Sequence, residues 1–117
     1  IVALYDEALA DLPIIRPSHA AEGDMHSWHL YVTQLADSAG VARDVFIERM
    51  FEQGIGCSVH YIPLHLQPYW RDTYKLTPEM FPVSQRIYER TVSLPLYTRM
   101  TEDDVTRVVA AVKVALG

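Results

Sequence analysis

The chain has 117 residues, of which 50% are apolar, and a formal net charge of -5. A domain of this size buries roughly two thirds of its unfolded surface, so it forms a core without disulfides or metals. The acidic balance excludes a general binder of nucleic-acid backbones, which needs a basic face. No apolar run approaches the roughly 20 residues of a membrane span, and no signal peptide is visible. We therefore expect neither a nucleic-acid nor a membrane partner.

The chain contains one cysteine, Cys57, which cannot form an intramolecular disulfide. This favours a reducing compartment, and we expect a cytoplasmic protein. The alternation of the surrounding residues indicates a buried, inert thiol rather than a nucleophile.

The N-terminal residues predict a helix that ends at Pro13, because proline breaks a helix interior. Its apolar face comprises Ile1, Tyr5, Ala8, Leu9 and Leu12. Neither a start methionine nor an N-cap residue precedes Ile1, so we expect the chain to be cut from a longer protein. A short strand over 14–15 and a polar loop over 17–26 follow.

Two strands and a helix are predicted between residues 28 and 62. Period-two alternation predicts a strand over 28–35 with apolar residues on both faces, which is typical of a central strand. A helix over 42–53 ends before Gly54, which suits a left-handed C-terminal position. A second alternating segment predicts a strand over 55–62. The buried stripe of the helix is predicted to contain Phe46, Ile47, Met50 and Phe51.

The segment 63–81 is a long connection rich in proline and aromatic residues. Connections of this length are usually functional or disordered, and its large rings argue against disorder. Pro82 suits the first turn of a third helix ending near residue 92, and 93–97 reads as an edge strand. Thr101 is the predicted N-cap of the last helix. The core stripe of that helix comprises Val105, Val108, Val109, Val112 and Leu116.

Helices and strands alternate, but the strands are few and short. This pattern predicts an α+β fold, with a small, mostly antiparallel sheet and helices packed on one face.

Three segments carry a resemblance to a known family: HSWHLYVTQL (26–35), GIGCSVHYIPLH (54–65) and SLPLYTRMTEDDV (93–105). Their order and spacing resemble the DegT/StrS-type pyridoxal-phosphate-dependent aminotransferases, which make amino sugars on nucleotide carriers. The resemblance implies that residues 1–117 are a single domain, the C-terminal small domain of a fold-type-I aminotransferase. Residues 1–12 resemble a remnant of the helix that links the large and small domains.

The resemblance implies a parent enzyme that transfers an amino group, from glutamate, to a keto-sugar nucleotide in amino-sugar and polysaccharide biosynthesis. Such a transaminase uses pyridoxal phosphate held by a lysine of the N-terminal large domain, and is a homodimer. Lys75 and Lys113 do not match that lysine's motif, so we expect this chain alone to bind no cofactor and to be inactive. The alternative is a stand-alone α+β module that binds a small ligand or dimerises.

The candidate substrate-binding residues implied by the resemblance are His60, Tyr61, His65 and Arg71. His60 and Tyr61 end a predicted strand at the active-site mouth, where imidazole and phenol groups offer directional polar atoms. The alternative is that Tyr61 is a core residue and His60 a structural histidine. Arg71 lies in an aromatic and basic cluster that is either a lid over the nucleotide or a loop packed on its own domain.

The sequence predicts no catalytic residue and no metal site in this chain. His29, His60 and His65 match no compact ligand spacing, and no cysteine or carboxylate accompanies them at helical intervals. We therefore expect these histidines to be solvated or hydrogen-bonded within the fold.

Overall fold

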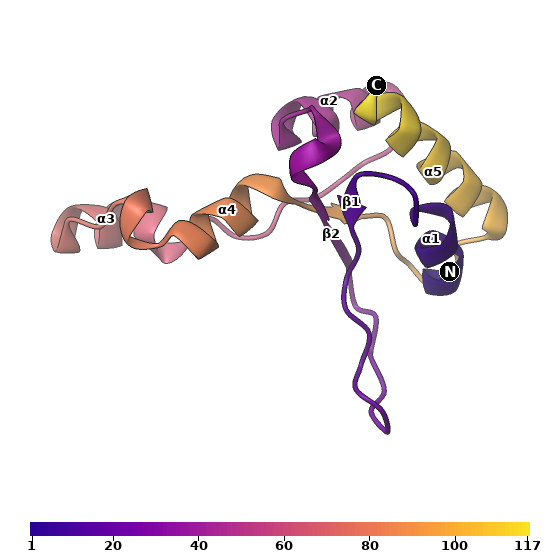
Figure 1. Cartoon of the computed structure of the whole chain (residues 1–117), viewed down its shortest axis with the longest axis horizontal. Coiled ribbons are helices and arrows are strands. Elements are labelled where there is room, and N and C mark those ends of the chain that lie inside the picture. The colour runs from indigo at the N-terminus through magenta and orange to yellow at the C-terminus, as the bar shows by residue number, and fades with distance from the viewer.

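The computed structural model describes residues 1–117 as a body of helices around a small sheet, from which an arm (residues 61–90) projects (Figure 1). The radius of gyration is 15.8 Å, whereas a compact domain of this length has about 13 Å. The arm and the loop between β1 and β2 account for the difference, because both extend away from the body (Figure 1). No helix combines the length and the apolar character needed to cross a membrane.

The body contains α1 (Val2–Ala8), β1 (Ile14–Ile15), β2 (Tyr31–Leu35), η1 (Asp37–Ala39), α2 (Arg43–Glu52), β3 (Thr91–Leu94) and α5 (Glu102–Leu116). The arm contains η2 (Leu64–Leu66), α3 (Pro68–Tyr74), η3 (Pro78–Met80) and α4 (Pro82–Arg90).

The sheet has three antiparallel strands in the order β1-β2-β3. In its register, Tyr31 lies opposite Leu94 and Gln34 lies opposite Thr91. Residues directly opposite each other share a face, and successive residues of a strand alternate between faces. The register therefore separates a core face from a second face, which carries Val32, Gln34, Thr91 and Ser93.

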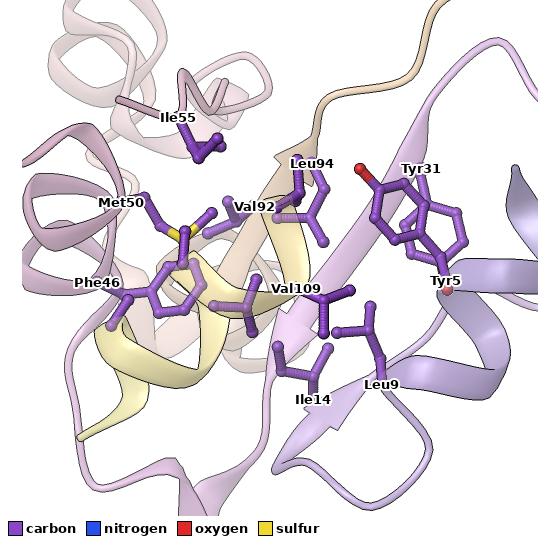
Figure 2. Close-up of a cluster of buried hydrophobic side chains, with 14 of the residues drawn as sticks. Tyr5, Leu9, Ile14, Tyr31, Phe46, Met50, Ile55, Val92, Leu94 and Val109 are labelled. Carbon is purple, nitrogen blue, oxygen red and sulfur yellow. The ribbon is translucent and has the colours of Figure 1, made fainter. Parts of the chain in front are cut away.

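The core lies between the sheet and α1, α2 and α5, as Figure 2 shows. Tyr5, Phe46 and Met50 are at most 1% exposed there, and they belong to one buried cluster with Val92 from β3 and Val109 from α5. The Tyr5 hydroxyl also donates a hydrogen bond to the Pro95 carbonyl at 2.9 Å, which anchors α1. This arrangement confirms the predicted α+β fold with a small antiparallel sheet.

The start of α5 is a capping box between Thr101 and Asp104. The Thr101 side chain accepts from the Asp104 amide, and the Thr101 amide donates to the Asp104 carboxylate at 2.9 Å. The hydrogen bond from the Thr101 backbone holds the pKa of Asp104 below its usual value. The predicted valine stripe of this helix is buried, with Val112 fully so.

The predicted strand over 55–62 is wrong. Only Ser58 forms a bridge, with both backbone hydrogen bonds to Ser93, and residues 59–62 then leave the sheet. Alternation in this segment reflects packing of Ile55 and Cys57 against the core rather than a ladder. The predicted strand over 28–35 begins only at Tyr31, because Trp28 has a left-handed φ of 48°.

Phe51 was predicted in the buried stripe of α2, but it is 76% exposed. Each residue turns the helix by about 100°, so Phe51 lies off the face that Phe46 and Met50 share at a spacing of four. The connection over 63–81 was expected to be functional or packed, and it forms η2, α3 and η3. Gly54 has the expected left-handed φ of 75° after α2.

The core around Met50 generates a stability prediction. Met50 is 0% exposed, so Met50→Ala removes buried methylene groups and leaves a cavity. We expect the free energy of unfolding to fall by about 2–5 kcal/mol, measured by urea denaturation. Met25→Ala is the matched control, because Met25 is 95% exposed and its loss changes stability by less than about 0.5 kcal/mol. Equal effects of the two substitutions would contradict the assigned core.

Candidate functional site

The second face of the sheet forms the floor of a groove of about 840 Å³. This size lies within the roughly 300–1,000 Å³ of small-molecule sites. One wall is the segment after the Ser58 bridge, and the other is α4 with Phe81 ahead of it. The lining residues are Val32, Gln34, Val59, His60, Tyr61, Pro63, Phe81, Pro82, Val83, Ser84, Ile87, Tyr88 and Thr91.

His60 and Tyr61 both line this groove. The Nε2 atom of His60 lies 3.5 Å from Oγ of Ser93, at the limit of a hydrogen bond, and the ring is exposed. Tyr61 is 95% exposed, so the alternative that placed it in the core is wrong. Two stiff rings with polar atoms therefore stand at one wall of the groove.

His65 lies inside the arm and not among the groove-lining residues. It is 4% exposed, its Nε2 lies 2.8 Å from Oε1 of Gln85, and its ring stacks on Phe81. The side chain thus bridges η2 and α4.

Arg71 lies on α3, apart from the groove. It pairs with Asp72 at 2.7 Å, and the hydrogen bond between them raises the pKa of Arg71 and lowers that of Asp72. Trp70 and Tyr74 stack beside it at 5.5 Å with an interplanar angle of 17°. Of the four predicted substrate-binding residues, the structure therefore brings only His60 and Tyr61 together at the groove.

The groove also contains residues that sequence reasoning missed, among them Gln34, Ser84 and Tyr88. Gln34 had a usable signal, because it alternates with the buried Thr33 and Leu35 along β2. Ser84 and Tyr88 are one helical turn apart on α4 and gave no such signal.

Polar contacts fix α4 beside the groove. Asp37 accepts from Arg86 at 2.7 Å and also pairs with Arg90, while the Arg43 guanidinium lies 4.8 Å from the centre of the Tyr88 ring. Arg86 and Arg90 looked like a solvated helix face in the sequence, but they join α4 to η1.

The groove contains neither lysine nor carboxylate. Pyridoxal phosphate requires a lysine for its imine and an acidic partner for its pyridine nitrogen. Lys75 ends α3, and Lys113 lies on α5 beside α1 at a different depression, both exposed. The residues of this chain therefore do not fit the cofactor by themselves.

Comparison with known proteins identifies the family to which the chain belongs. The family model of the DegT/DnrJ/EryC1/StrS aminotransferases matches residues 1–113. The chain belongs to this family. It is 41% identical over 114 residues to the uncharacterized protein MJ1066 of Methanocaldococcus jannaschii. It is 37% identical over 115 residues to the spore coat polysaccharide biosynthesis protein SpsC of Bacillus subtilis. Both matches cover 97% of this chain and 30% of the relative.

Solved structures of sugar aminotransferases have the same fold over this region. The putative sugar aminotransferase Spr1654 of Streptococcus pneumoniae in its PMP form has a TM-score of 0.85 at 26% identity, covering 98% of this chain and 29% of that one. DesV of S. venezuelae, solved with a ketimine intermediate, has a TM-score of 0.77 at 29% identity, covering 96% and 29%. The chain thus spans about 30% of the length of its relatives, and most of each relative lies outside the match.

The thiol of Cys57 generates a pH prediction for this aminotransferase-family chain. Burial raises the pKa of Cys57 to about 11 from an ordinary value of 9.0. Since only the thiolate reacts, we expect iodoacetamide at pH 8 to alkylate the native chain roughly a hundredfold more slowly than the unfolded chain. The native rate should keep rising with pH up to about 11. Equal rates for the native and the urea-unfolded chain would contradict this.

Proposed function

We propose that this chain is the C-terminal small domain of a pyridoxal-phosphate-dependent sugar aminotransferase. The observation that carries the proposal is the family match over residues 1–113, combined with coverage of only 30% of the relatives. The parent enzyme transfers an amino group from glutamate to a keto-sugar nucleotide. The name of SpsC supports a place in polysaccharide biosynthesis.

In this proposal the groove on the second face of the sheet is one wall of the active site. Relatives support a sugar-nucleotide ligand, since DesI was solved in the presence of its TDP-sugar product. His60 and Tyr61 contact the sugar or its phosphates, because they stand exposed at the wall of the groove. Direct contacts from His65 and Arg71 remain predictions, and neither side chain lines the groove.

Pyridoxal phosphate, when bound by the parent, supplies the electron sink that transamination needs. We assign its lysine to an N-terminal large domain, because Lys75 and Lys113 are exposed and neither lines the groove. This chain's residues orient substrate and exclude water, and the isolated chain is inactive. Residues 1–12 would continue toward that large domain, and the parent would reside in the cytoplasm.

The role of His60 can be tested in the parent enzyme. We expect His60→Ala to raise KM for the keto-sugar nucleotide about tenfold, because it removes a polar contact to the substrate, with a smaller change in kcat. Turnover is followed by the conversion of glutamate. His29→Ala is the matched control, since His29 is exposed and lies outside the groove. An unchanged KM for His60→Ala, or an equal effect of His29→Ala, would contradict the assignment.

The parent is proposed to be a homodimer, and the arm supports an interface. The arm leaves Tyr69 and Tyr74 at least 58% exposed on either side of Trp70, and exposed apolar clusters of this kind usually meet a partner. The alternative of a stand-alone module dimerises through its sheet instead, and an upstream reading frame without a lysine-bearing domain would support that alternative.

Sedimentation velocity of the 117-residue chain tests the exposed surfaces. We expect a species heavier than the monomer that forms as concentration rises, through the arm or the face carrying α1. Tyr69→Ser together with Tyr74→Ser should shift the equilibrium toward monomer if the arm is the surface used. A monomer at all concentrations would contradict self-association.

A further inference from the structure

One histidine occupies a position unlike the others. Of the five histidines, only His65 is buried, at 4% exposure. It is also the only buried residue between Ile55 and Thr91. The helices α3, η3 and α4 contain no buried side chain. The arm therefore has no apolar core of its own, and His65 is the point where its segments meet.

The contacts of His65 show which of its ring nitrogens carries a hydrogen. Nε2 of Gln85 donates to Oε1 of Glu89 at 2.7 Å, which leaves the Gln85 carbonyl oxygen directed at His65. An amide carbonyl oxygen only accepts, so the 2.8 Å contact requires that Nε2 of His65 carries the hydrogen. The ring also stacks on Phe81 at a centroid distance of 5.1 Å and an interplanar angle of 19°. Both the position and the orientation of the ring are thereby fixed.

These contacts join the two walls of the groove. His65 follows Pro63, which lines one wall beside His60 and Tyr61. Phe81 lines the other wall at the start of α4.

We propose that His65 is a positioning residue, whose hydrogen bond to Gln85 and stacking on Phe81 set the spacing of the two groove walls. Through Pro63 it holds His60 and Tyr61 toward the groove. The consequence for substrate binding rests on the proposed function, whereas the consequence for the arm does not. An apolar residue would fill the same space without setting the spacing of the two walls. It would also leave the Gln85 acceptor without its partner.

Amide hydrogen exchange of the 117-residue chain separates the hydrogen bond from mere burial. His65→Leu keeps the volume and the burial but removes the donor, whereas His65→Gln keeps a donor near the position of Nε2. We expect exchange of the Leu66 and Gln85 amides to accelerate about tenfold in His65→Leu and to stay within about threefold of the native rate in His65→Gln. Amides of β2 and α5 should be unaffected, and His29→Leu is the matched control.

Two results would overturn the proposal. In one, the arm amides of His65→Leu exchange as slowly as those of the native chain, which makes His65 a space-filling residue. In the other, the arm and the body lose protection equally, which makes its role a general contribution to stability. If His65→Leu does not fold, Glu89→Ala replaces it, because Glu89 is exposed and orients Gln85. Exchange of the Leu66 and Gln85 amides should then accelerate, because Gln85 is no longer held toward His65, and unchanged exchange would reject the proposal.

Kinetics of the parent enzyme distinguish this proposal from the proposed function. If both hold, His65→Leu raises KM for the keto-sugar nucleotide about tenfold and His65→Gln restores most of it. If exchange in the arm responds as expected while His60→Ala has no effect on KM, the groove is not the substrate site but His65 still positions the arm. If KM rises in His60→Ala while amide exchange in the arm is unchanged by His65→Leu, the positioning role of His65 is wrong and the proposed function still holds.

Discussion

The alternation of side chains along β2 is the constraint on which the rest of the structure depends. Tyr31, Thr33 and Leu35 point into the core, and Val32 and Gln34 point to the opposite face. A shift of one residue would exchange these two sets. The antiparallel register with β3 extends the same division, so one face of the sheet packs against the core and the other forms the floor of the groove.

The body and the arm are stabilised by different interactions. The body buries a continuous apolar cluster, in which Tyr5, Tyr31 and Met50 are fully covered (Figure 2). The arm depends on polar contacts, namely the ion pairs of Asp37 with Arg86 and Arg90, and the hydrogen bond between His65 and Gln85. Exposed ion pairs contribute little, so the arm should open more easily than the body.

Local signals in the sequence were sufficient for α5 and most of β2. The spacing of valines and the Thr101 cap predicted α5, and alternation predicted β2. Burial on one face produces a periodic pattern of apolar residues that is visible in the sequence itself. The predicted strand over 55–62 failed because alternation does not reveal whether a partner edge is available, and β3 offers only Ser93 there. The histidines were indistinguishable for a similar reason. The burial of His65 depends on Gln85, 20 residues later in the chain, whereas His60 remains exposed.

In the proposed function, a separate domain of the parent enzyme holds the cofactor, and this chain forms one wall of the substrate site. Titration of pyridoxal phosphate, followed by the absorbance of the lysine-bound cofactor, tests this division most directly when the 117-residue chain and the parent enzyme are compared. The parent should bind one cofactor per chain, and the 117-residue chain should show no stoichiometric lysine-bound absorbance. Stoichiometric binding by the 117-residue chain through Lys75 or Lys113 would contradict the account.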